Sequence, residues 1–185
     1  MKHESIKTIY VKKAVPALVE QFGYTNVFAI PKIQKVVVNV GLGRFLKEPK
    51  RIEEIVASLE AITGQKVVMV KAKKAVAGFK IRENQEIGAR VTLRGDRMWS
   101  FLDRFVKTAM PRVRDLQGIT ISSVDSHGNL NAGLKEHMVF PEIVAEKVQT
   151  IFGFQVNVTT TATNQAEGLV LFRTLGFPLQ TKEIN

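Results

Sequence analysis

The chain has 185 residues, no cysteine, 45% hydrophobic residues and a formal net charge of +10 at pH 7. This composition excludes disulfides, thiolate metal sites and cysteine nucleophiles, and it is apolar enough to form a core. No apolar run approaches the roughly 20 residues that a membrane-spanning helix needs, and no apolar signal segment follows the N-terminus. We therefore expect one cytoplasmic domain over residues 1–185, with a polyanion as its partner and no membrane association.

The positive charge is concentrated in one stretch. Residues 66–97 hold nine Lys and Arg against three Asp and Glu, whereas residues 98–185 hold eight of each kind. Such a local excess favours a nucleic acid over a small neutral substrate. One alternative is a solvated basic face that only aids solubility. Another is a surface for anionic lipid, although no basic amphipathic helix with an aromatic face is found.

The first third of the chain predicts a helix, a strand and a second helix. The first helix covers residues 4–22, and Pro16 either kinks it or begins its second part. Residues 33–40 predict a half-buried strand because apolar and polar residues alternate. The apolar positions are Val36, Val38 and Val40, and the opposite positions are Lys35, Val37 and Asn39. The second helix runs from Pro49 to about Ile62, with apolar residues at helical spacing.

The middle of the chain predicts a projecting hairpin. Two strands are expected over residues 66–71 and 87–94, and a basic segment joins them. Ile87, Ala89, Val91 and Leu93 share one side of the second strand, and Gly88, Arg90, Thr92 and Arg94 share the other. Two strands around a basic connection predict a basic hairpin or loop at about residues 71–86. A helix follows, with Asp96 as its N-cap and Pro111 limiting its length.

The last third begins with a second predicted hairpin. Its strands cover residues 119–124 and 130–134, around the turn-rich segment 125–129. A short helix is expected from Phe140 to about Val148.

The remaining elements complete the predicted fold. The last strand covers residues 154–162, and a capping box of Asn164 and Glu167 begins a final helix that ends at Gly176. Amphipathic strands interleaved with amphipathic helices predict an α+β fold. In this fold an antiparallel sheet carries helices on one face and leaves the other face open and polar.

The predicted open face combines cations with neutral hydrogen-bonding side chains and carries no carboxylate. Its positions are Lys35, Asn39, Arg90, Thr92, Arg94, Gln155, Asn157, Thr159 and Thr161. Cations contact phosphates, while amides and hydroxyls contact phosphate oxygens, base edges or the 2′-hydroxyl. Because no aromatic side chain is exposed for stacking, the face favours structured RNA recognised by shape and backbone. A plain polar sheet face is the alternative.

Signatures of catalysis are weak. Gly41-Leu42-Gly43 lacks the third glycine of a dinucleotide-binding loop. The candidates for a small-molecule enzyme site are Asp125, Ser126, His127, Glu136 and His137. This enzyme is kept as the alternative function, although we interpret both histidines as surface residues of a polar loop. We expect no catalytic residue, metal, cofactor or small-molecule substrate.

Ordered motifs along the chain carry a family resemblance. They are Ile30-Pro31-Lys32-Ile33, Asn39-Val40-Gly41-Leu42-Gly43, Thr63-Gly64-Gln65-Lys66, Lys71-Ala72-Lys73-Lys74, Phe79-Lys80-Ile81-Arg82, Val91-Thr92-Leu93-Arg94-Gly95, Arg97-Met98-Trp99, Pro111-Arg112-Val113-Arg114, Phe140-Pro141-Glu142-Ile143 and Thr159-Thr160-Thr161-Ala162. With these motifs the sequence resembles the bacterial large-subunit ribosomal protein conventionally numbered five, whose family binds 5S ribosomal RNA.

The resemblance implies a structural, non-enzymatic protein in the central protuberance of the large subunit. It implies an open face that holds 5S ribosomal RNA and a hairpin tip that reaches the peptidyl-site transfer RNA. It also implies contacts with large-subunit ribosomal RNA and a bridge to a protein of the small-subunit head.

Two sets of residues are expected to carry these contacts. The resemblance assigns Asn39, Gln65, Thr92 and Arg94 to 5S ribosomal RNA, and strand alternation adds Lys35, Arg90, Asn157 and Thr159. The hairpin motif assigns Lys71, Lys73, Lys74, Lys80 and Arg82 to the transfer RNA.

The chain departs from the family pattern at two places that bear on contacts. Ser126 stands where the family usually has a glycine, which affects the expected shape of the turn and its part in the bridge. The tail after Pro178 replaces a usual Phe-Arg-Lys ending.

Overall fold

The protein is built around a five-stranded antiparallel sheet with strand order β2-β3-β1-β5-β4. The strands are β1 (Ile33–Gly41), β2 (Val68–Lys71), β3 (Glu86–Leu93), β4 (Leu130–Leu134) and β5 (Phe154–Thr160). The structure is a computed structural model that describes residues 4–114, 118–144, 146 and 148–180. The end of the C-terminal tail and two positions of the predicted helix over 140–148 therefore lie outside the described residues.

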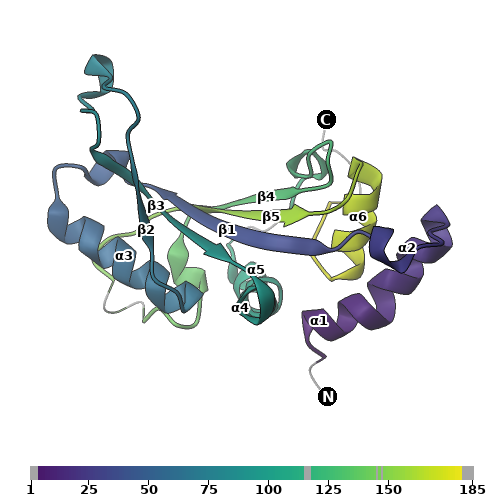
Figure 1. The fold of residues 1–185 in the computed structure, drawn as a ribbon. Helices are drawn as coiled ribbons and strands as arrows, with labels where there is room; N and C mark the ends of the chain where they lie inside the picture. The colour runs from purple at the N-terminus through teal and green to yellow at the C-terminus, as the bar shows by residue number, and fades with distance from the viewer. Residues whose placement is uncertain (1–3, 115–117, 145, 147, 181–185) are drawn as a thin grey trace.

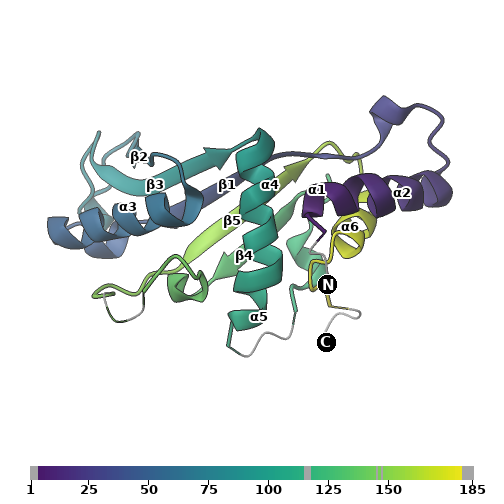
Figure 2. The same ribbon diagram turned by 90° about the horizontal axis from the view of Figure 1, so that it is seen from below.

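Helices cover one face of this sheet and flank one of its ends (Figure 1 and Figure 2). They are α1 (Ile6–Ile9), α2 (Val15–Phe22), α3 (Pro49–Thr63), α4 (Gly95–Arg104), α5 (Met110–Arg112) and α6 (Gln165–Thr174). Figure 1 shows α3 and α4 below the strands, and the view from below in Figure 2 shows them in front of the sheet. In the described part of the chain, no helix lies over the middle of the opposite face. The α+β architecture with one covered face is as predicted.

The covered face of the sheet is aliphatic. Val38 of β1 lies opposite Val91 of β3 and Val156 of β5, and all three side chains are at most 1% exposed. Strand alternation sends the intervening residues to the other face, so that the same strands build the core and display the open face. On the helix side, the Phe101 ring of α4 stacks on that of Phe105 with a centroid distance of 5.9 Å.

The N-terminal helix has two parts, as Pro16 predicts. A π-helical turn over Tyr10–Ala14 joins α1 to α2, and Pro16, which has no N–H to donate, lies in the first turn of α2 directly after it. Gly23 ends α2 with φ +68°, a left-handed conformation that glycine adopts without steric cost. Gly64 ends α3 in the same way with φ +66°.

The predicted strand over residues 119–124 is wrong. Ile121–Ser123 form a 3₁₀ turn instead, and Val124 makes only an isolated bridge with Leu130. Ile119 pairs in parallel with Leu179, near the other end of the chain. The Ile119 N–H donates to Pro178 O at 2.7 Å, so a distant segment takes the place of the expected neighbouring strand.

Two other local predictions are also wrong. Among the described residues 140–144, 146 and 148 there is no α-helix; a 3₁₀ turn over His137–Val139 precedes them. Asp96 is not the N-cap of α4, because Arg94 occupies that position. The Asp96 carboxylate instead accepts a hydrogen bond from Lys7 Nζ at 2.8 Å.

Candidate nucleic-acid interface

The open face is arranged in rows that cross the sheet. The strand register places Asn39 opposite both Arg90 and Gln155. The next row contains Thr92, Val37, Asn157 and Asn131, and the row after it contains Lys35 and Thr159. The structure therefore brings the predicted strand residues together on one surface. Val37, which strand alternation places on this side, is half-buried there. The 58% exposed Val68 adds apolar area that the predicted positions of this face did not include.

This surface is depleted in negative charge. Among all residues of the five strands, Glu86 is the only carboxylate, and it lies at the end of β3 opposite Lys71. The cations Lys35 and Arg90 lie nearer the middle of the sheet. A phosphate backbone lying across these rows meets cations and neutral donors without charge repulsion.

Arg94 and Gln65 extend the surface beyond the strands. Arg94 is exposed and precedes α4, one residue past the end of β3. The Gln65 side-chain amide donates to the backbone carbonyl of Thr92 at 3.0 Å. This bond fixes the segment after α3 against β3 and holds Gln65 at the edge of the open face.

Asn131 is a face residue that the candidate set omitted. It lies opposite Asn157, whose Nδ2 donates to Asn131 Oδ1. The signal was present in the sequence, because Asn131 alternates with the buried Leu130 and Ala132. The bond orients both amides at the β4 end of this row before any ligand binds.

The predicted hairpin projects from the sheet as an arm, which we define as residues 72–85 (Figure 1). At its base the Ala72 N–H donates to Gln85 O at 2.8 Å, and near its tip Val76 and Ile81 exchange two backbone hydrogen bonds. Ala77–Phe79 form a 3₁₀ turn, after which Lys80 adopts φ +55°. The arm is thus an ordered ribbon with a strained residue at its tip.

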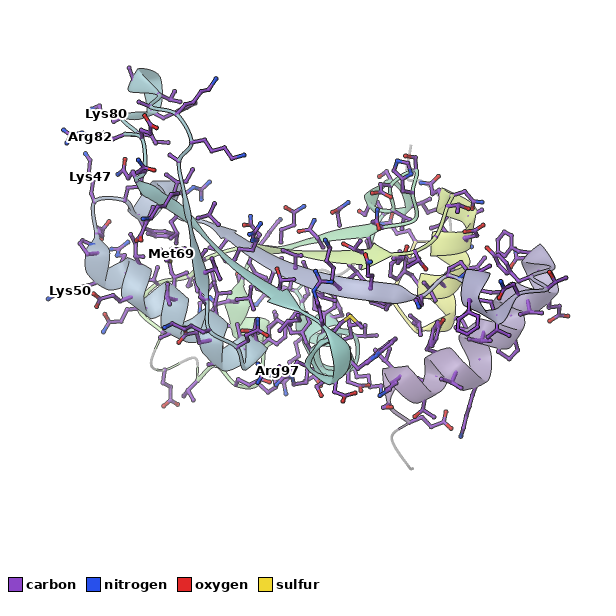
Figure 3. All side chains as sticks on the ribbon, in the orientation of Figure 1. Lys47, Lys50, Met69, Lys80, Arg82 and Arg97 are labelled. Carbon is purple, nitrogen blue, oxygen red and sulfur yellow. The ribbon has the colours of Figure 1, made fainter. Side chains whose placement is uncertain are left out.

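The arm displays its cations to solvent. Lys73, Lys74, Lys80 and Arg82 are exposed, as is Lys71 at the end of β2. Figure 3 shows Lys80 and Arg82 far from the sheet, whereas Met69 of β2 lies at its level. Phe79 at the tip is 77% exposed, so the arm presents an aromatic ring beside its cations. The expectation that no aromatic side chain is exposed for stacking concerns the open face and not the arm.

Comparisons with known proteins cover nearly the whole chain. Residues 26–82 match the family model described as Ribosomal protein L5, and residues 86–179 match the model of the C-terminus of the same ribosomal family. The large ribosomal subunit protein uL5 of Microcystis aeruginosa is 47% identical over 177 residues, covering 96% of this chain and 99% of the relative. That of Carboxydothermus hydrogenoformans is 46% identical over 173 residues, covering 94% and 97%.

The chain belongs to the ribosomal protein L5 family. As a uL5 protein it is a structural constituent of the large ribosomal subunit. The two matched parts are not separate in space, because β1 from the first part lies between β3 and β5 from the second. Both matched parts therefore contribute strands to the open face.

The turn at residues 125–129 tolerates the loss of the usual family glycine. Asp125 Oδ1 accepts the backbone N–H groups of His127 and Asn129 at 2.9 and 2.8 Å, and Oδ2 accepts the Asn129 side-chain amide. Burial acts to raise the pKa of Asp125, but these bonds hold it below its ordinary value of 3.8. Ser126 is not among the residues with a positive φ, so this position does not require glycine.

The structure separates the residues of the alternative enzyme site. His127 precedes β4 and His137 follows it, and a five-residue strand spans about 17 Å. His137 is fully buried, contrary to the surface position predicted for it, and its ring stacks on Phe152 at 4.0 Å. Burial lowers its pKa and favours the neutral form. These histidines do not form one site.

Two features are absent from the described part of the chain. None of the helices found there is both long and apolar enough to cross a membrane. In the same part of the chain, no three His, Asp or Glu side chains gather closely enough to hold a metal ion.

Proposed function

We propose that this large-subunit protein binds 5S ribosomal RNA through the open face of its sheet, in the central protuberance. The residues proposed for this contact are Lys35, Asn39, Gln65, Arg90, Thr92, Arg94, Asn157 and Thr159. The observation that carries the proposal is the composition of the face: five strands contain a single carboxylate, at their margin, while cations and amides form its rows.

The arm is proposed to contact the transfer RNA in the peptidyl site. The residues proposed for this contact are Lys73, Lys74, Lys80 and Arg82 of the arm, together with Lys71 at the end of β2. Figure 3 shows Lys80 and Arg82 away from the sheet, at a distance from any RNA that lies on the strands. An exposed cation on a projecting ribbon reaches a phosphate without displacing the RNA that is bound elsewhere. Contacts with large-subunit ribosomal RNA, and a bridge to a protein of the small-subunit head, complete the proposed set of partners within the cytoplasmic ribosome.

Filter binding of the purified protein to 5S ribosomal RNA over a salt series tests the main proposal. We expect the logarithm of the affinity to fall linearly with the logarithm of the salt concentration. Arg90→Ala should weaken binding about tenfold and reduce the slope by roughly one, because one phosphate contact is lost. Lys13→Ala, an exposed cation on the helical side of the fold, is the control and should bind as the wild type does. A wild-type affinity that is independent of salt, or no binding, contradicts the proposal.

A further inference from the structure

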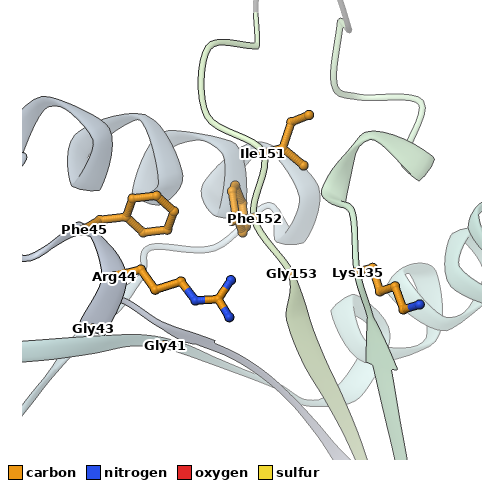
Figure 4. A pocket seen from close by; sticks show the side chains of 8 residues that line it. All are labelled: Gly41, Gly43, Arg44, Phe45, Lys135, Ile151, Phe152 and Gly153. Atoms are coloured by element: carbon orange, nitrogen blue, oxygen red, sulfur yellow. The ribbon is translucent and has the colours of Figure 1, made fainter.

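A pocket of about 500 Å³ opens at one end of the open face. It forms where β1 and β4 end and β5 begins, since both β1 and β4 run antiparallel to β5. Figure 4 shows its lining, which comes from three segments far apart in the sequence. The lining residues are Gly41, Gly43, Arg44, Phe45, Lys135, Ile151, Phe152 and Gly153.

The floor of this pocket continues the open face. Asn39 pairs with Gln155, and two residues beyond them are Gly41, at the end of β1, and Gly153, just before β5. Continuing the alternation of the two strands places both glycines on the side of Asn39 and Gln155. A side chain at Gly41 would meet nothing within 4 Å, so the floor there is bare backbone. At Gly153, a Cβ atom would lie 2.8 Å from Leu134 O, so this position excludes other residues. A flat group can therefore approach the backbone at the end of the face.

The walls of the pocket are apolar. Phe45 is half-buried on one side, and the 57% exposed Ile151 lies on the other. Phe152 is 4% exposed and is held in place by its stack on His137. Figure 4 shows the Phe45 and Phe152 side chains among the residues that line the pocket. Rigid aromatic and aliphatic walls suit a planar ring.

Two cations flank these walls. Arg44 extends into the pocket from the turn after β1, and Lys135 follows β4 on the opposite side (Figure 4). Both are exposed, and no acidic residue lines the pocket. Within the described residues neither side chain takes part in an ion pair. An apolar slot between two unpaired cations matches a ring that carries a phosphate.

We propose that this pocket receives one unstacked nucleotide of the RNA that lies on the open face, with its ring against Phe45 and Ile151 and its phosphate between Arg44 and Lys135. The inference rests on the proposed 5S ribosomal RNA contact. An RNA strand is favoured over a free nucleotide because the pocket floor is continuous with the rows that hold the RNA backbone. The open face, whose rows contact the RNA backbone, then has one position at which a base stacks on an aromatic ring.

Three variants test this pocket in the same 5S binding assay. Phe45→Leu keeps the apolar packing but removes the ring, and we expect about tenfold weaker binding with an unchanged salt slope. Arg44→Gln and Lys135→Gln should each weaken binding several-fold and lower the slope by roughly one. Lys13→Gln is the matched control. Thermal melting of each variant shows whether the fold is kept.

A photo-crosslinker at position 45 identifies the occupant. Replacing Phe45 with p-benzoylphenylalanine should yield a crosslink at one nucleotide of 5S ribosomal RNA, and the same replacement at the exposed Phe28 should not give that product. If adenosine monophosphate competes for this crosslink while RNA affinity is unchanged in the three variants, a free nucleotide is the ligand and the inference is wrong. If the three variants bind as the wild type while Arg90→Ala does not, the pocket is empty of RNA but the proposed function stands. If the wild-type protein does not bind 5S ribosomal RNA, the proposed function itself is rejected.

Discussion

The open face and the arm are both basic, but the fold supports them in different ways. On β1, Lys35 and Asn39 alternate with valines that are buried against the helices, so the core fixes the positions of the face residues. On the arm, every residue from Lys73 to Lys80 is exposed, and the ribbon depends on a few backbone hydrogen bonds. A pre-formed surface suits a permanent partner, and a weakly supported ribbon suits a partner that comes and goes.

The largest effect on stability is expected where the sheet framework is most tightly packed. At Gly168 of α6, a Cβ atom would lie 2.6 Å from the Cα atom of Gly128. We expect Gly168→Ala to lower the free energy of unfolding by about 1–3 kcal/mol, although alanine favours helices, because two backbones must separate. The matched control is Gly78→Ala on the arm, where a Cβ atom meets nothing within 4 Å. If urea denaturation shows the same loss of free energy of unfolding for both variants, the contrast between a tightly packed framework and a weakly supported arm is wrong.

A smaller effect is expected at Glu167, which ties the start of α6 to the framework. Its carboxylate accepts the Thr163 N–H at 2.9 Å and the Asn164 amide at 3.0 Å, while the Asn164 side chain accepts the Glu167 N–H at 2.9 Å. This is the predicted pairing of Asn164 with Glu167, except that the carboxylate bonds to the residue before the N-cap. Glu167→Gln should cost about 1–2 kcal/mol at neutral pH, because hydrogen bonds to a charged acceptor are weakened.

The pH dependence of this contribution has a definite sign. Burial acts to raise the pKa of Glu167, but the bonds from Thr163, Tyr24 and Asn164 hold it below its ordinary value of 4.5. The folded state therefore binds fewer protons than the unfolded state near pH 4, and the stabilisation is complete above pH 4.5 and lost as the pH falls through the folded pKa. Unfolding measured from pH 7 down to pH 3 should show a shallower acid decline for Glu167→Gln than for the wild type. Equal declines would show that this carboxylate is not coupled to folding.

The smallest effect on global stability is expected on the arm. Gln85 Oε1 accepts the Arg82 N–H at 3.0 Å and so braces the base of the ribbon. Gln85→Ala should change the free energy of unfolding by less than about 0.5 kcal/mol, since no core contact is removed. Amide exchange at Val76 and Ile81, whose N–H groups bond across the ribbon, should become faster. Unchanged exchange at these two amides would mean that the tip is held independently of its base.

The strands in which apolar and polar residues alternate could be predicted from the sequence. The period of two in β1, β3 and β5 fixes both the buried and the open residues, because a half-buried sheet imposes that period. Contacts between distant segments could not be predicted in this way. Ile119 bonds with residues 178–180, and Glu54 of α3 accepts the Gln149 and Thr150 N–H groups near the helix predicted over 140–148.

The residues of the candidate RNA interface also divide into those that alternation predicts and those that depend on contacts between distant segments. Face residues on strands were found from alternation, and Gln65 was found only through the family resemblance, since its position depends on a bond to Thr92. The pocket beside Gly41 was not predictable, because residues near positions 44, 135 and 152 meet only when β1, β4 and β5 are assembled.

The open face is proposed to bind 5S ribosomal RNA and the arm to bind transfer RNA. Measuring both RNA affinities for two variants tests this assignment most directly. In one variant an Asn-Gly turn replaces residues 73–84, joining Ala72 to Gln85, which already share a hydrogen bond at 2.8 Å. The other variant is Arg90→Ala with Arg94→Ala. We predict that the shortened arm keeps 5S ribosomal RNA affinity within about twofold but weakens peptidyl-site transfer RNA binding to reconstituted ribosomes, whereas the double face variant loses 5S affinity by at least about tenfold. Equal losses of 5S affinity in the two variants would contradict the account.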